Sequence, residues 1–119
     1  MRWVLRGNLS GAVKEALERH EHSVSELDLP ADAPPFEFLK TAQSKQLDVM
    51  TNDAALVNAI FDQSIFFNRS IVFLQLEGGD VEQDDAIDRL FQRYKRLTPG
   101  RLYTVTGSRV KIRQLPGKK

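Results

Sequence analysis

The stretch Arg69–Gly100, RSIVFLQLEGGDVEQDDAIDRLFQRYKRLTPG, decides the fold. It begins with an apolar run over 69–76 that is rich in β-branched and aromatic residues and ends in two glycines, as a buried strand does. From Asp80 onward the apolar residues recur every three or four positions, which predicts an amphipathic helix that continues to the Thr-Pro-Gly at 98–100. A buried strand followed by such a helix is the repeating unit of a parallel α/β sheet.

The same alternation extends over the rest of the chain. Strands are predicted over 1–6, 22–29 and 47–53, helices over 7–22, 34–46 and 54–63, and two short strands around a tight turn over 101–115. We therefore expect an α/β fold of three layers. Its mostly parallel sheet of about five strands is flanked by helices on both faces and ends in a C-terminal edge hairpin or strand. Residues 1–115 are expected to form this single domain, followed by a disordered basic tail at 116–119.

The composition excludes several classes of site. The chain has 119 residues, 17 basic and 16 acidic side chains, and no cysteine. Disulfides, thiolate metal sites and cysteine nucleophiles are therefore excluded. Because the net charge is only +1, any site for a polyanion has to be a local patch. No apolar run is long enough to span a bilayer and the N-terminus lacks a signal-peptide pattern, so we expect a cytoplasmic protein with no membrane partner.

Polar residues follow the first and third predicted strands. Arg6 and Asn8 come at the end of the first strand, and Thr51, Asn52 and Asp53 come at the end of the third. The carboxyl ends of parallel strands are where open α/β sheets gather their ligands. We therefore expect these five residues to form a binding site, in which Arg6 stands where many such folds place a catalytic carboxylate.

The order of elements over nearly the whole chain, together with three short segments, carries a resemblance to a known family. The segments are Asn8-Leu9 after the first strand, LDVMTNDAAL at 47–56, and SRVKIRQLP at 108–116. In their order along the chain they resemble the PIN-like family of small uncharacterised prokaryotic proteins. Its members typically begin with a strand ending Asp-Glu-Asn-Leu, carry Thr-Arg-Asp-x-Asp-Phe after the third strand, and close with an arginine-bearing edge strand. Active PIN domains, such as VapC-type toxins of toxin–antitoxin systems, are Mg²⁺- or Mn²⁺-dependent ribonucleases. The resemblance thus implies a PIN-like fold and a hydrolase-like, nuclease ancestry.

The acidic motifs of the family are degenerate in this chain. The first motif reads Arg6-Gly7-Asn8-Leu9, and the second aspartate and the phenylalanine of the later motif are Ala55 and Leu56. Metal-dependent cleavage of a phosphodiester needs several carboxylates that converge on hard divalent cations. The resemblance therefore implies an active site that has lost much or all of its activity.

Four acidic residues are candidates for what remains of such a site. Asp53 and Glu37 are the predicted catalytic residues, Asp53 and Glu77 the predicted metal ligands for Mg²⁺ or Mn²⁺, and Asp80 a further ligand candidate. Arg6 opposes metal binding, because one fixed charge about 5 Å from a divalent ion, at an effective dielectric constant of about 20, costs roughly 6–7 kcal/mol. We predict that Arg6 neutralises Asp53 directly and replaces the metal.

Each candidate also has a purely structural interpretation. Asp53 is among the best helix N-cap residues, and Glu37 suits the first turn of a helix because of the helix dipole. Arg6 could be a solvated surface residue at a strand end. Ile65, Phe66 and Phe67 could be core residues or an apolar patch for a partner.

Two basic arrays bear on possible partners. Arg89, Arg93 and Arg96 are predicted to share one helix face, and Arg109, Lys111 and Arg113, at every second position, to share one face of the last strand. Such arrays can bind RNA phosphates, although charged residues also protect an exposed edge strand. Three functions stay open: a PIN-like nuclease that has lost its activity, a non-catalytic module for RNA or for a protein such as a cognate antitoxin, and an active Mg²⁺/Mn²⁺ ribonuclease with rearranged carboxylates. The family resemblance also implies a homodimer.

Overall fold

Strands and helices alternate along the chain up to α4, after which a β-hairpin closes the fold. The computed structural model describes residues 1–30, 32–76 and 78–117. The strands are β1 (Arg2–Arg6), β2 (Ser23–Ser25), β3 (Asp48–Thr51), β4 (Ile71–Leu74), β5 (Arg101–Val105) and β6 (Val110–Gln114). The helices are α1 (Gly11–Arg19), α2 (Pro35–Ser44), α3 (Ala54–Asp62) and α4 (Asp80–Arg93).

The sheet has the order β2-β1-β3-β4-β5-β6. Its first five strands are parallel, and β6 runs antiparallel to β5 at the edge. The predicted α/β architecture, with a mostly parallel sheet and a C-terminal hairpin, is therefore confirmed. The order 2-1-3-4-5 of the parallel strands is one of the two common doubly wound orders, the one found in flavodoxin. The chain changes direction across the sheet between β1 and β3, and ligands of such sheets bind beside that point, at the carboxyl ends of the strands.

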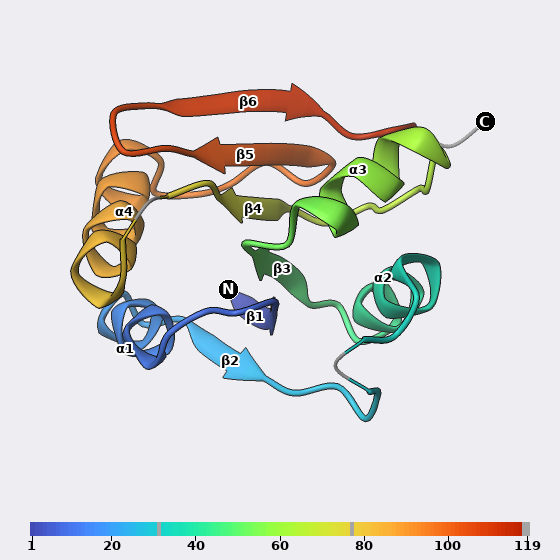
Figure 1. Cartoon of the computed structure of the whole chain (residues 1–119), viewed down its shortest axis with the longest axis horizontal. Coiled ribbons are helices and arrows are strands. Elements are labelled where there is room, and N and C mark those ends of the chain that lie inside the picture. Colours follow the sequence, from blue (N-terminus) through green and yellow to red (C-terminus); the bar gives the residue numbers. More distant parts are fainter. Residues whose placement is uncertain (31, 77, 118–119) are drawn as a thin grey trace.

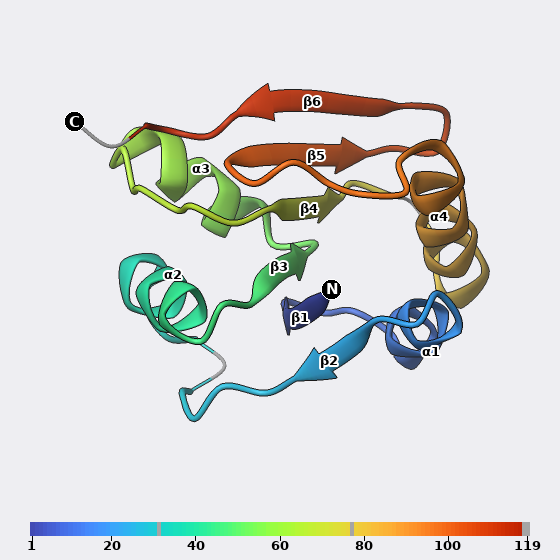
Figure 2. The same ribbon diagram turned by 180° about the vertical axis from the view of Figure 1, so that it is seen from behind.

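Helices cover both faces of the sheet, which makes three layers. Helices α1 and α4 lie side by side against one face, and α2 and α3 lie against the other (Figures 1 and 2). Two apolar clusters fill the two interfaces; one contains Trp3, Leu17 and Leu90, and the other contains Phe38 and Ile60. None of the helices described is long and apolar enough to cross a membrane.

The helix starts follow the local sequence. Ser10 caps α1 by accepting a hydrogen bond from the Ala12 backbone N–H at 3.2 Å, and Asp53 caps α3 in the same way. Pro35 occupies the first position of α2, where its missing N–H costs nothing. The starts of α2 and α3 agree with the predictions to within one residue, whereas α1, predicted to begin at residue 7, begins at Gly11 after its cap Ser10.

The end of α4 differs from the prediction. The helix ends at Arg93, well before Thr-Pro-Gly, because Tyr94 adopts an extended backbone (φ −126°, ψ 100°). The Tyr94 ring packs edge-on against Tyr103, with the ring centroids 5.6 Å apart, and the Tyr103 hydroxyl accepts a hydrogen bond from the Thr98 N–H. These contacts with β5 replace further helical turns. Arg96 therefore lies outside the helix, and the prediction that it shares a helix face with Arg89 and Arg93 is wrong.

The apolar segment after α3 divides between core and surface. Ile65 and Phe67 are buried in the cluster beneath α2 and α3, whereas Phe66 is 39% exposed. Two of its three large side chains therefore belong to the core, which leaves a single exposed phenylalanine and not a continuous apolar patch.

Trp3, the only tryptophan of the chain, is tied to a histidine. Its indole Nε1–H donates to His22 Nδ1 at 2.8 Å, and the two rings stack with centroids 6.2 Å apart. Burial lowers the pKa of His22, and the positive charges of the N-terminus and His20 lower it further. A proton on Nδ1 would remove the acceptor that Trp3 uses.

We expect acidification from about pH 7.5 to about pH 5.5 to lower the melting temperature through His22. The folded pKa lies below the unfolded one, so the unfolded chain binds more protons as the pH falls through that window, and stability is lost there. Thermal unfolding of wild type and His22→Gln, whose amide oxygen can still accept from Trp3, isolates the effect. Equal pH dependence in both proteins would contradict it.

Candidate functional site

The candidate site lies at the carboxyl ends of β1 and β3, where the strand order reverses. In the sheet register Arg6 stands opposite Thr51, so the loops that follow the two strands start side by side. The structure thus brings together Arg6, Asn8, Asn52 and Asp53, as predicted. Thr51 is fully buried, and its Oγ1 accepts a hydrogen bond from the Asp53 N–H at 2.9 Å, so it supports the loop.

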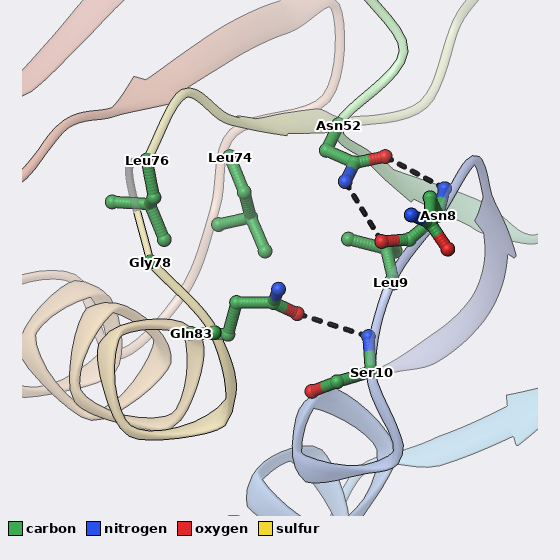
Figure 3. Close-up of a pocket in the computed structure, with 9 residues that line it drawn as sticks. Asn8, Leu9, Ser10, Asn52, Leu74, Leu76, Gly78 and Gln83 are labelled. Carbon is green, nitrogen blue, oxygen red and sulfur yellow. Dashed lines mark hydrogen bonds between the residues drawn. The ribbon is translucent and has the colours of Figure 1, made fainter.

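Two asparagines latch these loops together. The Asn8 N–H donates to Asn52 Oδ1 at 2.9 Å, and Asn52 Nδ2 donates to the Asn8 carbonyl at 3.0 Å (Figure 3). The chain reaches this geometry through Gly7, whose φ is +107°. A Cβ on Gly7 would lie 2.3 Å from Asn52 Oδ1, so the close approach requires a glycine. The side-chain amide of Asn52 therefore holds the loops together by bonding to the backbone N–H and carbonyl of Asn8.

Arg6 and Asp53 form an ion pair. Arg6 Nε lies 3.5 Å from Asp53 Oδ2, and the other oxygen of Asp53 accepts the helix-capping hydrogen bond from the Ala55 N–H at 3.0 Å. The predicted neutralisation of Asp53 by Arg6 thus agrees with the distance between them. Asp53 is at once an N-cap and the partner of an arginine.

The Arg6 side chain is buried, with only 9% of its surface exposed. Its Nη1 donates to the Ala33 carbonyl at 2.8 Å, and the guanidinium carbon lies 4.8 Å from the centroid of the Phe38 ring. Nε is buried and has no hydrogen-bond partner among the described residues, because its approach to Asp53 is an ion-pair contact without hydrogen-bond geometry. Arg6 is therefore packed into this edge of the sheet. The alternative interpretation, in which Arg6 is a solvated surface residue, is wrong.

Of the other predicted carboxylates, the two that the structure describes, Glu37 and Asp80, do not form a cluster with Asp53. Glu37 is exposed in the first turn of α2, where it suits the helix dipole, and Asp80 is exposed at the start of α4. Glu77 lies outside the described residues. In the ranges 1–30, 32–76 and 78–117, no three histidine, aspartate or glutamate side chains gather closely enough to hold a metal ion. A lone carboxylate already paired with arginine is not a donor set that fits Mg²⁺ or Mn²⁺.

A polar pocket of about 350 Å³ lies on the α1 and α4 side of this edge. Figure 3 shows Asn8, Asn52 and Ser10 on one side of it and Gln83 of α4 on the other. Gln83 Oε1 accepts a hydrogen bond from the Ser10 N–H at 3.1 Å, which ties α4 to the start of α1. The polar groups that line this pocket thus bond largely to one another.

A larger pocket, of about 570 Å³, lies beside Arg6. We call it the Arg6 pocket. Its polar or charged lining includes Arg6, Lys14 and Glu26, and its apolar lining includes Val24 and Phe38. Sequence reasoning identified Arg6 but missed this pocket, because Lys14, Val24 and Glu26 carry no motif and meet Arg6 only through the crossover from β1 to β2.

Two histidines near the end of α1 are engaged in structural contacts. His20 Nε2 lies 2.8 Å from Asp88 Oδ1 of α4, and Arg19 pairs with the same carboxylate. The hydrogen bonds from His20 and Arg19 hold the pKa of Asp88 below its usual range. Since His22 is bonded to Trp3, neither ring is arranged for metal binding with the other.

The basic residues in and next to the last strand lie at the open edge of the sheet. Arg109, Lys111 and Arg113 are all exposed. The Arg113 guanidinium carbon stacks 3.6 Å from the centroid of the Phe61 ring of α3. Arg109 lies in the turn before β6, so the prediction that it belongs to the last strand is wrong. These side chains are accessible to a partner but lie away from Asp53 along the sheet order.

A comparison of the chain with protein-family models, with curated proteins and with solved structures finds no match, so the role of the site has to be inferred from its own contacts.

Proposed function

We propose that this chain is a PIN-like protein, related to the metal-dependent ribonucleases of toxin–antitoxin systems, that has lost its metal centre and acts by binding. The observation that carries the proposal is the double engagement of Asp53, which caps α3 through one oxygen and faces Arg6 Nε at 3.5 Å through the other. A metal ion at Asp53 would have to displace a guanidinium that stays charged at any ordinary pH.

The electrostatic cost of that displacement supports the proposal. A fixed charge about 5 Å from a divalent ion costs roughly 6–7 kcal/mol at an effective dielectric constant of about 20. Even a third of this figure weakens metal binding by more than about tenfold, since each decade of affinity is worth about 1.4 kcal/mol. Arg6 cannot easily turn away, because its side chain is buried between Ala33 and Phe38.

The proposal is tested by incubating single-stranded RNA with the protein in the presence and absence of Mn²⁺. We expect no Mn²⁺-dependent cleavage by wild type above that of Asp53→Asn. Cleavage that requires Mn²⁺ and disappears in Asp53→Asn would overturn the proposal and favour an active nuclease with rearranged carboxylates.

The exposed basic residues of β6 and of the turn before it favour RNA as the bound partner. RNA held through phosphate contacts dissociates steeply as salt rises, and each lost contact lowers the salt slope by roughly one. We expect filter binding to show retention of uncleaved RNA that is weakened in Arg109→Gln and Lys111→Gln. The control is Arg2→Gln in β1, which β3, β4 and β5 separate from β6 in the sheet. Salt-independent or absent retention would move the search to protein partners, such as an antitoxin or a second copy of the chain.

A further inference from the structure

The Arg6 pocket has the size and wall chemistry of a small-molecule site. Its volume of about 570 Å³ lies within the range of roughly 300–1,000 Å³ that is typical of ligand pockets. It opens at the carboxyl ends of β1 and β2, next to the point where the strand order reverses. The apolar part of its wall is formed by Val4, Leu5, Val24, Leu27, Leu29, Pro30 and Phe38.

Arg6 supplies a buried cation with unused donors to this pocket. A guanidinium has five N–H donors, and in the described parts of the chain one of them, on Nη1, has an acceptor, the Ala33 carbonyl. Nε is buried without a hydrogen bond, although Asp53 Oδ2 lies 3.5 Å away and offsets part of the charge. A buried donor without an acceptor is unfavourable, and more so when it is charged. An anion that accepts hydrogen bonds from this guanidinium would reduce that cost.

A second cation lines the same pocket. Lys14 of α1 is exposed and forms no ion pair with the described residues. Glu26 also lines the pocket and is exposed to solvent. With Arg6 and Lys14 against Glu26, the lining carries one net positive charge. A buried cation, an exposed cation and apolar side chains thus line the same pocket, which suits an anionic head group on an apolar body.

We propose that the Arg6 pocket binds a small organic carboxylate with an aromatic or aliphatic body, its head group held by Arg6 and assisted by Lys14. The planar fork of arginine suits the two oxygens of a carboxylate, and Phe38 lies against both the guanidinium and the pocket. The inference goes beyond the proposed function, because the Arg6 pocket contains no residue of β6. The two can fail separately, because the RNA assays measure cleavage and retention of RNA and the ligand assay measures neither.

The test is a titration of the full chain with phenylpropanoate, followed by calorimetry and by NMR chemical-shift mapping. Phenylpropanamide, which keeps the body and removes the charge, is the matched ligand control, and inorganic phosphate tests whether the head group alone suffices. We expect phenylpropanoate to bind and to shift the amide signals of Gly7 and Ser25, and we expect the amide to bind at least about tenfold more weakly.

Three variants locate the binding. Lys14→Gln, an exposed helix substitution that preserves the fold, is expected to weaken binding a few-fold, and Arg6→Gln to weaken it about tenfold or more. Arg2→Gln removes the same charge from the exposed start of β1 and is expected to change nothing. Binding of acid and amide with equal affinity, no binding of either, or equal affinity in wild type and the folded Lys14→Gln and Arg6→Gln variants would overturn the proposal.

Discussion

Replacing Arg69 with methionine is expected to lower the free energy of unfolding by about 3 kcal/mol. The Asp48 side chain is only 2% exposed, at the amino end of β3, and its Oδ2 lies 3.2 Å from Arg69 Nη2. Its other oxygen accepts a hydrogen bond from the Ser70 N–H at 2.9 Å. Arg69→Met would leave a buried carboxylate with no counter-charge, which is among the costliest single changes in a small domain.

The matched control is Asp48→Asn. The amide oxygen can still accept from Ser70, and Arg69, which is 34% exposed, can turn its charge to solvent. We expect a loss of only about 1 kcal/mol. Urea unfolding with a common m-value measures both changes. Equal losses in the free energy of unfolding would contradict this expectation, because removal of the partly exposed arginine should cost more than neutralisation of the buried aspartate.

Gly7→Ala is expected to destabilise the protein by roughly 2–4 kcal/mol. A φ of +107° is strained for any residue with a side chain, which costs about 1–3 kcal/mol. The added Cβ would also meet Asn52 Oδ1 at 2.3 Å and break the latch between Asn8 and Asn52, worth roughly a further 1 kcal/mol. The same change would loosen the loop that follows Arg6.

Gly11→Ala, four residues further along the chain, is the control for Gly7→Ala. Gly11 begins α1, and a Cβ there meets no atom within 4 Å, so alanine should be neutral or stabilising by up to about 1 kcal/mol. A comparison of the melting temperatures of the two variants separates the specific cost of a side chain at Gly7 from the general effect of replacing a glycine. A neutral Gly7→Ala would contradict the description of this turn.

Periodicity and capping residues predicted most of the fold. The strand at 71–74 and the starts of α2 and α3 follow from short-range chemistry that the sequence displays directly. The end of α4 does not. Its apolar spacing continues past Arg93, but the packing of Tyr94 on Tyr103 and the hydrogen bond between Thr98 and Tyr103 end the helix early. Those partners are brought together only by the sheet, so no local pattern could indicate them.

The sequence predicted only the part of the candidate site that follows from the carboxyl ends of parallel strands lying at one edge of the sheet. Arg6 and Asp53 were expected to be neighbours because β1 and β3 were both expected to be parallel strands, and the structure places them 3.5 Å apart. The burial of Arg6 depends on Ala33 and Phe38, which come from the loop before α2 and from α2 itself. The position of that loop relative to β1 is a tertiary property, and so is the Arg6 pocket beside it.

The most direct test of the central claim, that Arg6 occupies the place of a metal at Asp53, is an NMR titration with Mn²⁺. Paramagnetic Mn²⁺ broadens the amide signals of residues close to where it binds, so the Asp53 and Ala54 signals report on this site. We expect these signals to stay sharp in wild type and to broaden in Arg6→Asp, which removes the guanidinium and adds a second carboxylate. Selective broadening at Asp53 and Ala54 in the wild-type protein would contradict this claim.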